Sequence, residues 1–264
     1  MTHTHIIYSD FNKDQVKILE QFGITVQAKY DRFDIEENET YQELKPYLDN
    51  WVIHESVITK FTEEEESNAK RLILLSPWAN GYPMPDGDNG YQHTTYDNTE
   101  YCNTCGMGLR QKDFFRLKKA TNWRGYKRMF SLNWVFDELF VRKDFYESLF
   151  KPIGIKSKKV LLYKKETVIE DTVQLIIPET EASLALESYP FEICKDCGRK
   201  RYDLIRKGFF PSFKEDIGDM QIFKSKEWFG TGASSRKYIF VSQKFRQNII
   251  KSKINASYIP CENS

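Results

Sequence analysis

The chain has 264 residues, of which 40% are hydrophobic and 15% aromatic, so it can form a sizeable core and intrinsic disorder is excluded. No apolar run approaches the roughly 18 residues of a membrane span, and the first residues lack a secretory signal pattern, so we expect a cytoplasmic protein without membrane segments. The net charge of +1 hides a division: residues 1–100 carry 8 Lys/Arg against 19 Asp/Glu, and the other 164 carry 31 against 19. Such a division is compatible with a nucleic-acid-binding half, but also with halves that pair with each other or face solvent.

The first part of the chain has the pattern of an α/β lobe. A short strand is predicted at residues 5–8, followed by a helix that Asp10 caps and Gly23 ends. The next predicted elements are a strand at 24–33, a helix at 41–47, an extended segment at 51–61, and a helical turn in which Thr62 caps the acidic run 63–66.

Residues 77–99 are dense in Pro, Gly, Asn and Asp, which excludes a long regular element and predicts an ordered loop or lid. The aromatic side chains in this loop argue against a flexible linker. We therefore expect two parts: an acidic N-terminal lobe with this loop at residues 1–99, and a second part at residues 100–264.

Two copies of the motif Cys-x-x-Cys-Gly use four of the five cysteines: Cys102, Cys105, Cys194 and Cys197. Each motif forms a tight turn that directs two sulfurs to one side, and the glycine allows a positive φ. Thiols stay reduced in the cytoplasm, so the pattern predicts one structural zinc ion bound by all four thiolates. An iron–sulfur centre is the alternative metal. Cys261 is expected to be a free thiol near a fraying terminus, with a role as a further ligand as the alternative.

The segments 140–151 and 240–251 resemble each other, since both read as the end of an apolar strand that continues into a helix. The preceding strands are predicted at 129–141 and 238–241. This pattern favours an internal repeat of about 100–163 and 192–260, joined by the zinc; strand-to-helix turns with similar residues are the alternative. The expected fold class is α+β, with mixed or antiparallel sheets and short helices.

Catalytic patterns are weak. The sequence contains no P-loop, nucleophile elbow or His-Glu-x-x-His motif. His93 in the 77–99 loop is the best candidate for a catalytic group, but a hydrogen-bonded loop histidine explains it equally well. Asp137 and Glu138 are expected at a turn or bulge. We therefore expect a protein that is not an enzyme.

Basic residues surround the second cysteine motif with aromatic residues between them, a mixture that would suit nucleic-acid binding. Nearby acidic residues interrupt this charge, and the pI of about 7.6 is low for a dedicated nucleic-acid-binding protein. The candidate residues for this alternative function are Arg199, Lys200, Arg201, Arg206 and Lys207.

The motifs Cys102-Asn-Thr-Cys105-Gly106 and Cys194-Lys-Asp-Cys197-Gly198-Arg199, together with Phe229-Gly230, Val241-Ser242 and a terminal helix ending near Tyr258-Ile259-Pro260, resemble the bacterial double-CXXCG-motif proteins. That family includes immunity proteins of polymorphic toxin systems. The resemblance covers about residues 100–264, and it implies the metal ligands and no catalytic residue. It suggests a protein partner such as a toxin, for which the candidate contacts are Glu36, Glu37, Glu39, Trp78, Tyr82 and Tyr91.

Overall fold

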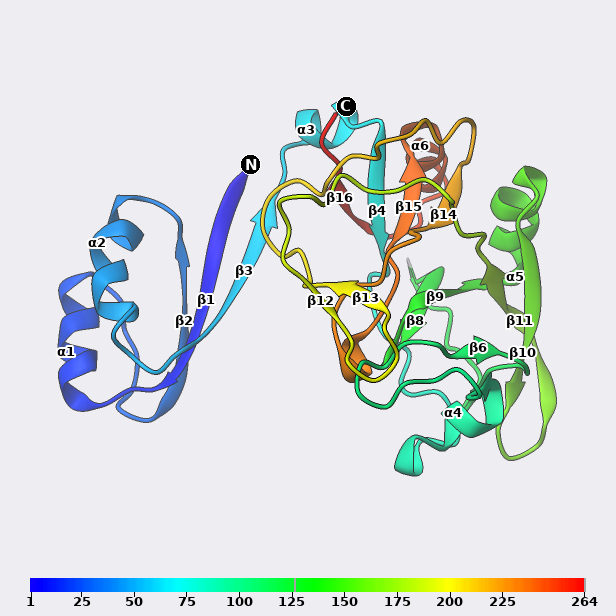
Figure 1. Cartoon of the computed structure of the whole chain (residues 1–264), viewed down its shortest axis with the longest axis horizontal. Coiled ribbons are helices and arrows are strands. Elements are labelled where there is room, and N and C mark those ends of the chain that lie inside the picture. The colour runs from blue at the N-terminus through cyan, green and yellow to red at the C-terminus, as the bar shows by residue number, and fades with distance from the viewer. Residues whose placement is uncertain (126, 264) are drawn as a thin grey trace. The chain divides into compact units, whose positions relative to one another are not determined.

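The computed structural model describes residues 1–125 and 127–263, and it has the expected α+β class with short helices and mainly antiparallel sheets (Figure 1). The chain forms two compact units. The smaller unit comprises Met1–Asn68 and Ile205–Phe209, and the larger unit comprises Ala69–Leu204 and the chain from Phe210 onward.

This division differs from the expected boundary at residue 99. Strand β4 (Arg71–Leu75) pairs with β15 (Ile239–Ser242) and β16 (Ser257–Pro260), so the chain from Ala69 onward belongs to the larger unit. The segment 205–209 in turn belongs to the smaller unit. Both assignments depend on contacts between residues far apart in the sequence, which local composition does not encode.

The smaller unit is a three-stranded antiparallel sheet in the order β2-β1-β3, with α1 and α2 on one face (Figure 1). Alternate residues of β1 are buried because only one face of the sheet contacts these helices. The elements are β1 (Thr2–Asp10), α1 (Lys13–Gln21), β2 (Tyr30–Glu36), α2 (Glu39–Leu48), β3 (His54–Lys60) and α3 (Glu63–Asn68).

Two local predictions in this unit are wrong. Asn12, and not Asp10, caps α1, because its side chain accepts the N–H groups of Asp14 and Gln15 while Asp10 still pairs in β1. The second strand lies at 30–36 instead of 24–33, where its pairing with β1 places Phe33 and Ile35 in the core. The helical turn after Thr62 is present as α3.

The larger unit contains a five-stranded sheet in the order β7-β10-β11-β9-β8 and a four-stranded sheet in the order β14-β15-β4-β16. Two short hairpins, β5-β6 and β12-β13, carry the cysteine motifs between their strands. Its remaining elements are η1 (Gly87–Asn89), α4 (Gly90–Thr95), β5 (Tyr96–Asp97), β6 (Arg110–Gln111), β7 (Arg116–Leu117), β8 (Met129–Leu132), β9 (Val135–Arg142), α5 (Lys143–Phe145), η2 (Tyr146–Phe150), η3 (Lys151–Ile153), β10 (Lys156–Leu162), β11 (Thr167–Ile176), β12 (Phe191–Ile193), β13 (Lys200–Tyr202), β14 (Ile222–Lys224), η4 (Gly232–Ser234) and α6 (Gln243–Lys251).

Four strands of the first sheet, in the order β10-β11-β9-β8, correspond to the four strands β16-β4-β15-β14 of the second. The hairpins β8-β9 and β14-β15 both stack a pair of phenylalanine rings across neighbouring strands: Phe130 on Phe140 with centroids 5.1 Å apart, and Phe223 on Phe240 at 5.6 Å. A helix follows the second strand of each hairpin, starting at Lys143 and at Gln243. These correspondences extend the similarity seen in the sequence to strand pairing and core packing.

One strand of each sheet, β11 in the first and β4 in the second, comes from outside the segments 100–163 and 192–260 of the expected repeat. In the first sheet β9 pairs antiparallel with β11, and in the second sheet β15 pairs antiparallel with β4. Yet β4 precedes the first cysteine motif and β11 precedes the second. Each motif is therefore preceded in the chain by a strand that pairs in the sheet built mainly from the other of these two segments.

Two further predictions for this unit are corrected. The strand expected at 129–141 is a hairpin that turns at Asn133 and Trp134. The last helix ends at Lys251, and residues 257–260 form strand β16 because they pair with β4.

In the described part of the chain the longest helix is α2, with 10 residues, so none of the helices there has the length and apolarity to cross a membrane.

Candidate metal centre

The two cysteine motifs form matching turns, here called the first knuckle (residues 102–107) and the second knuckle (residues 194–199). In the first knuckle the N–H of Gly106 donates to the carbonyl of Cys102, and in the second the N–H of Gly198 donates to that of Cys194, both at 2.8 Å. Both glycines have the expected positive φ, of 77° and 71°.

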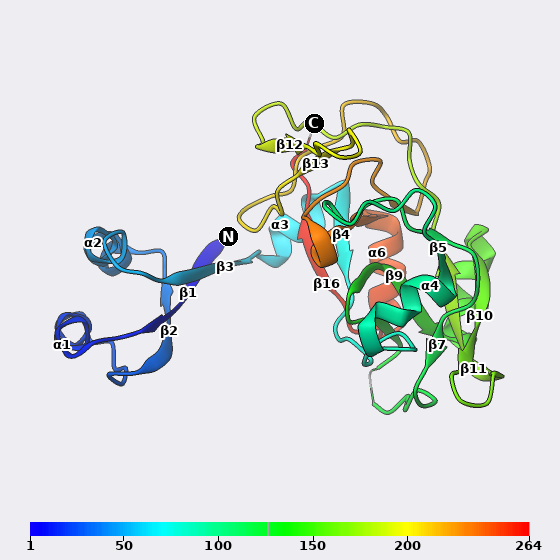
Figure 2. The same cartoon turned by 60° about the horizontal axis from the view of Figure 1, so that its bottom comes forward.

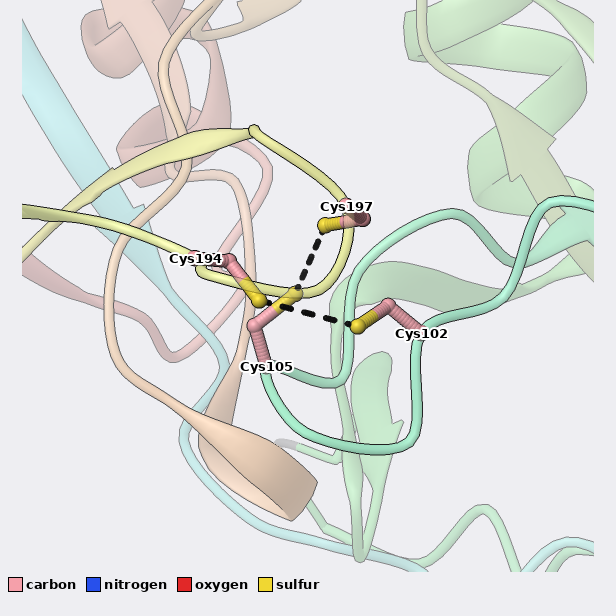
Figure 3. A group of neighbouring side chains, drawn as sticks. All are labelled: Cys102, Cys105, Cys194 and Cys197. Carbon is pink, nitrogen blue, oxygen red and sulfur yellow. Dashed lines mark hydrogen bonds between the residues drawn. The ribbon is translucent and has the colours of Figure 1, made fainter.

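The four sulfur atoms converge from the two knuckles, as Figure 3 shows. They lie within 4.8 Å of one another, and the cross-knuckle distances are 3.7 Å between the sulfurs of Cys102 and Cys194 and 3.6 Å between those of Cys105 and Cys197. Zinc–sulfur bonds of about 2.3 Å at tetrahedral angles separate the sulfurs by about 3.8 Å. A disulfide would need about 2.05 Å. The spacing therefore fits a tetrahedral metal site and excludes disulfides between these pairs.

The knuckles are held together by polar contacts outside the sulfurs. Arg199 of the second knuckle donates through Nη1 to the carbonyl oxygens of Glu100, at 2.8 Å, and Met107, at 3.3 Å. Thr104 of the first knuckle donates to the carboxylate of Asp196. These contacts fix the relative position of the two sulfur pairs, which reduces the conformational entropy that a metal would have to restrict.

The first knuckle is also packed against the connection between β14 and β15. The N–H of Gly232 donates to the carbonyl of Cys105 at 3.0 Å. A Cβ atom added to Gly106 would lie 2.1 Å from the carbonyl oxygen of Gly232, whereas one added to Gly198 would meet no atom within 4 Å. Glycine is therefore required at position 106 by both its positive φ and the nearby carbonyl of Gly232. At position 198 only the positive φ requires it.

The surroundings of the sulfurs favour a structural role. Three of the cysteines are buried, and Cys197 is partly exposed. The N–H groups of Cys105 and Thr104 donate to the sulfur of Cys102 and lower the pKa of that thiol, while burial raises the pKa of Cys105. Four thiolates fill a tetrahedral shell and leave no position for water or substrate. These residues can therefore hold a metal ion, and they offer it no site for catalysis.

The predicted partner-binding residues are only partly accessible. Glu36 and Glu39 are exposed in the smaller unit, but Glu37 is partly buried and forms an ion pair with Lys207 at 2.7 Å. In the larger unit Tyr82 is 43% exposed, whereas Trp78 packs on Phe130 and Tyr91 is buried. The structure does not bring these residues together within one unit.

The predicted nucleic-acid-binding residues also belong to different units, with 199–201 in the larger unit and 206–207 in the smaller. Arg199 braces the knuckles, and Arg201 forms an ion pair with Glu192. Lys200 lies over the rings of Phe191 and Tyr202. Of the five, Arg206 is the one with no ion pair or ring contact among the described residues.

Two other candidate residues, His93 and Cys261, are held by contacts within the protein. His93 lies on α4, and its Nδ1 is 2.9 Å from the side-chain amide of Asn98. Cys261 lies outside the sulfur cluster, and its backbone N–H donates to the carbonyl of Arg71. It is 3% exposed, and burial raises the pKa of its thiol. The chain at Cys261 is therefore paired into a sheet and does not fray.

Sequence reasoning missed a buried polar network beside the sheets. Glu138 lies within β9, at the irregularity where the pairing with β8 shifts register, which fits the expected bulge, and it forms an ion pair of 2.6 Å with Lys224 of β14. Gln174 donates to the other oxygen of Glu138 at 2.9 Å. A charged residue inside an apolar strand run, as in Ile222-Phe223-Lys224, was the available signal for a buried pair.

Comparison of the chain with known protein families, with characterised proteins and with solved structures finds no significant match. The assignment of the metal centre therefore depends on the geometry of the four cysteines.

Proposed function

We propose that this is a non-enzymatic zinc protein that acts by binding a protein partner through its acidic smaller unit. The main observation in support is the charge of the two units. The smaller unit has 8 Lys/Arg against 15 Asp/Glu, a net −7, and the rest of the chain has 31 against 23, a net +8. A surface of one sign raises the association rate with a partner of opposite charge.

The proposed metal is a single zinc ion with a structural role. Four thiolates can bind zinc and also iron. Zinc is favoured because it is redox-inactive and is commonly bound by two Cys-x-x-Cys turns. Metal analysis of the purified protein tests this assignment. The expected result is one zinc per chain, and the loss of the ion when Cys197 is changed to Ser.

The resemblance to double-CXXCG-motif proteins suggests the kind of partner. We propose a bacterial, cytoplasmic immunity protein that neutralises a cognate toxin. An inhibitor of a toxin with a cationic active site gains speed and specificity by presenting carboxylates to it. Glu36 and Glu39 are exposed and free to do so, and Glu36 borders a hollow of about 390 Å³ that also includes His3 and Gln42.

The protein encoded immediately upstream of this chain is the partner to test, by measuring association rates against salt concentration. The double variant Glu36→Lys/Glu39→Lys should slow association at least tenfold at low salt, and the difference should vanish at high salt. The control is Asp14→Lys/Glu20→Lys, which reverses two exposed charges on α1. The proposed acidic contact is contradicted if the association rate does not depend on salt concentration, or if both variants lower it equally.

The alternative of a nucleic-acid-binding face at the second knuckle has less support. Its arginine and lysine side chains are divided between two units, and most of them already have partners within the chain.

A further inference from the structure

Two long stretches of the larger unit carry only positive charge. Residues 114–136 contain six Lys/Arg and no Asp/Glu, and residues 148–165 contain another six and no Asp/Glu. Together they account for much of the positive charge of this unit. Neither stretch adjoins the second knuckle, where the basic residues considered above are located.

The five-stranded sheet brings these stretches together. Strand β7 pairs in parallel with β10, with Leu117 opposite Leu162, and the N–H of Tyr163 donates to the carbonyl of Leu117 at 2.9 Å. The chain therefore leaves both strands in the same direction, as Lys118-Lys119 and as Lys164-Lys165. Neighbouring strands are about 4.8 Å apart. Figure 2 shows the loop after β7 and the hairpin between β10 and β11 at the lower edge of the larger unit. We call these four lysines the basic end.

The charges of the basic end are available to a ligand. All four lysines are exposed, and none forms an ion pair with any residue among 1–125 and 127–263. The acidic residue in the turn of this hairpin, Glu166, is held by Arg116, whose Nε donates to both carboxylate oxygens at 2.8 and 2.9 Å, and the exposed Glu170 and Asp171 lie further along β11. The adjacent loop adds the exposed Arg124 and Lys127.

The fold itself does not require these lysines. In the second copy Phe210 takes the place of Phe115: both rings contact the equivalent phenylalanine of the next hairpin, and both lie beside a parallel strand. The segment that follows Phe210 contains Lys214, but Glu215 and Asp216 come directly after it. The same framework is thus compatible with mixed charge after this phenylalanine, and the pair Lys118-Lys119, which no acidic residue follows directly, is found only after Phe115.

The composition of the basic end favours a phosphate backbone over a protein surface. Protein interfaces centre on exposed aromatic and apolar side chains. In the described part of the larger unit such side chains lie elsewhere, at Tyr82, Trp134, Phe136, Ile176, Phe191, Ile193 and Ile250, with Val168 as the apolar exception at this end of the hairpin. Flexible lysines without apolar neighbours suit contacts to phosphates that are independent of base sequence.

We propose that the basic end binds the sugar–phosphate backbone of a nucleic acid. This surface is separate from the acidic contact of the proposed function and does not depend on it. The charges of the four lysines would displace the counterions condensed on the phosphates, so binding would weaken steeply as the salt concentration rises.

The test is a titration of the full chain with fluorescent 30-mers of single- and double-stranded DNA and RNA at several salt concentrations. Poly-glutamate and vesicles containing phosphatidylserine serve as other polyanions. The variant Lys118→Gln/Lys119→Gln/Lys164→Gln/Lys165→Gln should bind at least tenfold more weakly at low salt, and the slope of log K against log salt should fall by roughly three. The control variant, Lys143→Gln/Lys244→Gln/Lys251→Gln/Lys253→Gln, removes the same charge from exposed lysines elsewhere in this unit and should bind like the original protein.

The proposal is supported if a nucleic acid binds most tightly and only the basic-end variant loses affinity. It is overturned if no nucleic acid binds at low salt, if both variants lose affinity equally, or if poly-glutamate or the vesicles bind more tightly than every nucleic acid. Circular dichroism of both variants verifies that the loss does not come from unfolding.

Discussion

Lys224 is a buried cation that forms an ion pair with the carboxylate of Glu138. Burial by itself would lower its pKa, but Glu138 and Asp137 outweigh this effect and raise the pKa to about 12. Because the folded pKa lies above the ordinary value of 10.5, the pair contributes its full stability below pH 10.5 and loses it only as the pH rises through 12. The pair is therefore intact at neutral pH, and substitution is the way to test it.

Lys224→Met should lower the free energy of unfolding by about 3–5 kcal/mol, because it leaves the carboxylate of Glu138 buried without its cation. The double variant Lys224→Met/Glu138→Leu should regain part of that loss, since neither charge remains. Denaturant unfolding at pH 7 measures both changes. Lys226→Met, at an exposed lysine two residues further on, is the control and should change stability by about 0.5 kcal/mol at most. If Lys224→Met were as stable as the control, the ion pair between Lys224 and Glu138 would not be formed in solution.

At the scale of elements, the segment 205–209 is held to the smaller unit by three kinds of contact. Lys207 pairs with Glu37, and the N–H of Gly208 donates to the hydroxyl of Thr59 at 2.9 Å. The ring of Phe209 lies 5.2 Å from that of Phe61. This segment is the reason that the smaller unit is not a single continuous stretch of chain, and its attachment depends on pH through Glu37.

The hydrogen bond from Lys207 lowers the pKa of Glu37 below its ordinary value of 4.5. A lowered carboxyl pKa gives stability that is present above pH 4.5 and is lost as the pH falls below it. Lys207→Gln should therefore reduce hydrogen-exchange protection of residues 205–209 at pH 7 to the level that the original chain shows in acid. Arg206→Gln is the matched control and should leave protection unchanged. Equal protection in both variants would mean that the ion pair does not hold the segment.

At the scale of the whole molecule, each of the two units has a hydrophobic core of its own among the described residues. The core of the smaller unit contains Ile7, Leu19 and Leu44. The hydrophobic clusters described for the larger unit contain no residue of the range 1–68. The metal centre belongs to the larger unit alone, since both knuckles lie there. Loss of the metal should consequently affect the two units very differently.

Removal of the metal with a strong chelator, or the change Cys197→Ser, should unfold or aggregate the larger unit and leave the smaller unit folded. Structural zinc contributes roughly 10–16 kcal/mol in zinc-finger peptides, which exceeds the stability of most domains. Hydrogen exchange measured on individual peptides distinguishes the two units. As a second measurement, the fluorescence of Trp51, the single tryptophan of the smaller unit, reports on that unit when the other tryptophans of the chain are changed to Phe. Cys261→Ser is the control, and it should keep one metal ion per chain. A larger unit that stays folded without metal would refute the structural role.

The candidate metal ligands were identified from the sequence because a Cys-x-x-Cys-Gly turn is local: its spacing and its glycine determine where the sulfurs point. The same is true of the cap at Thr62 and of the amphipathic helices α2 and α6, whose patterns lie within a few residues. The prediction that 129–141 is one strand was wrong because its turn at Trp134 uses a residue with φ of 65°, a conformation usually adopted by Gly or Asn.

The sequence alone determined the α+β class, the four cysteines and the similarity of two segments a hundred residues apart. Only the tertiary structure decided the boundary between the units, the sheets to which β4 and β11 belong, the pairing of Lys207 with Glu37, and the meeting of two lysine pairs beside β7 and β10. The physical reason is the range of the interactions. Turns, caps and periodicity are fixed by neighbouring residues, whereas strand partners and ion pairs depend on which distant segments bury the most apolar surface together.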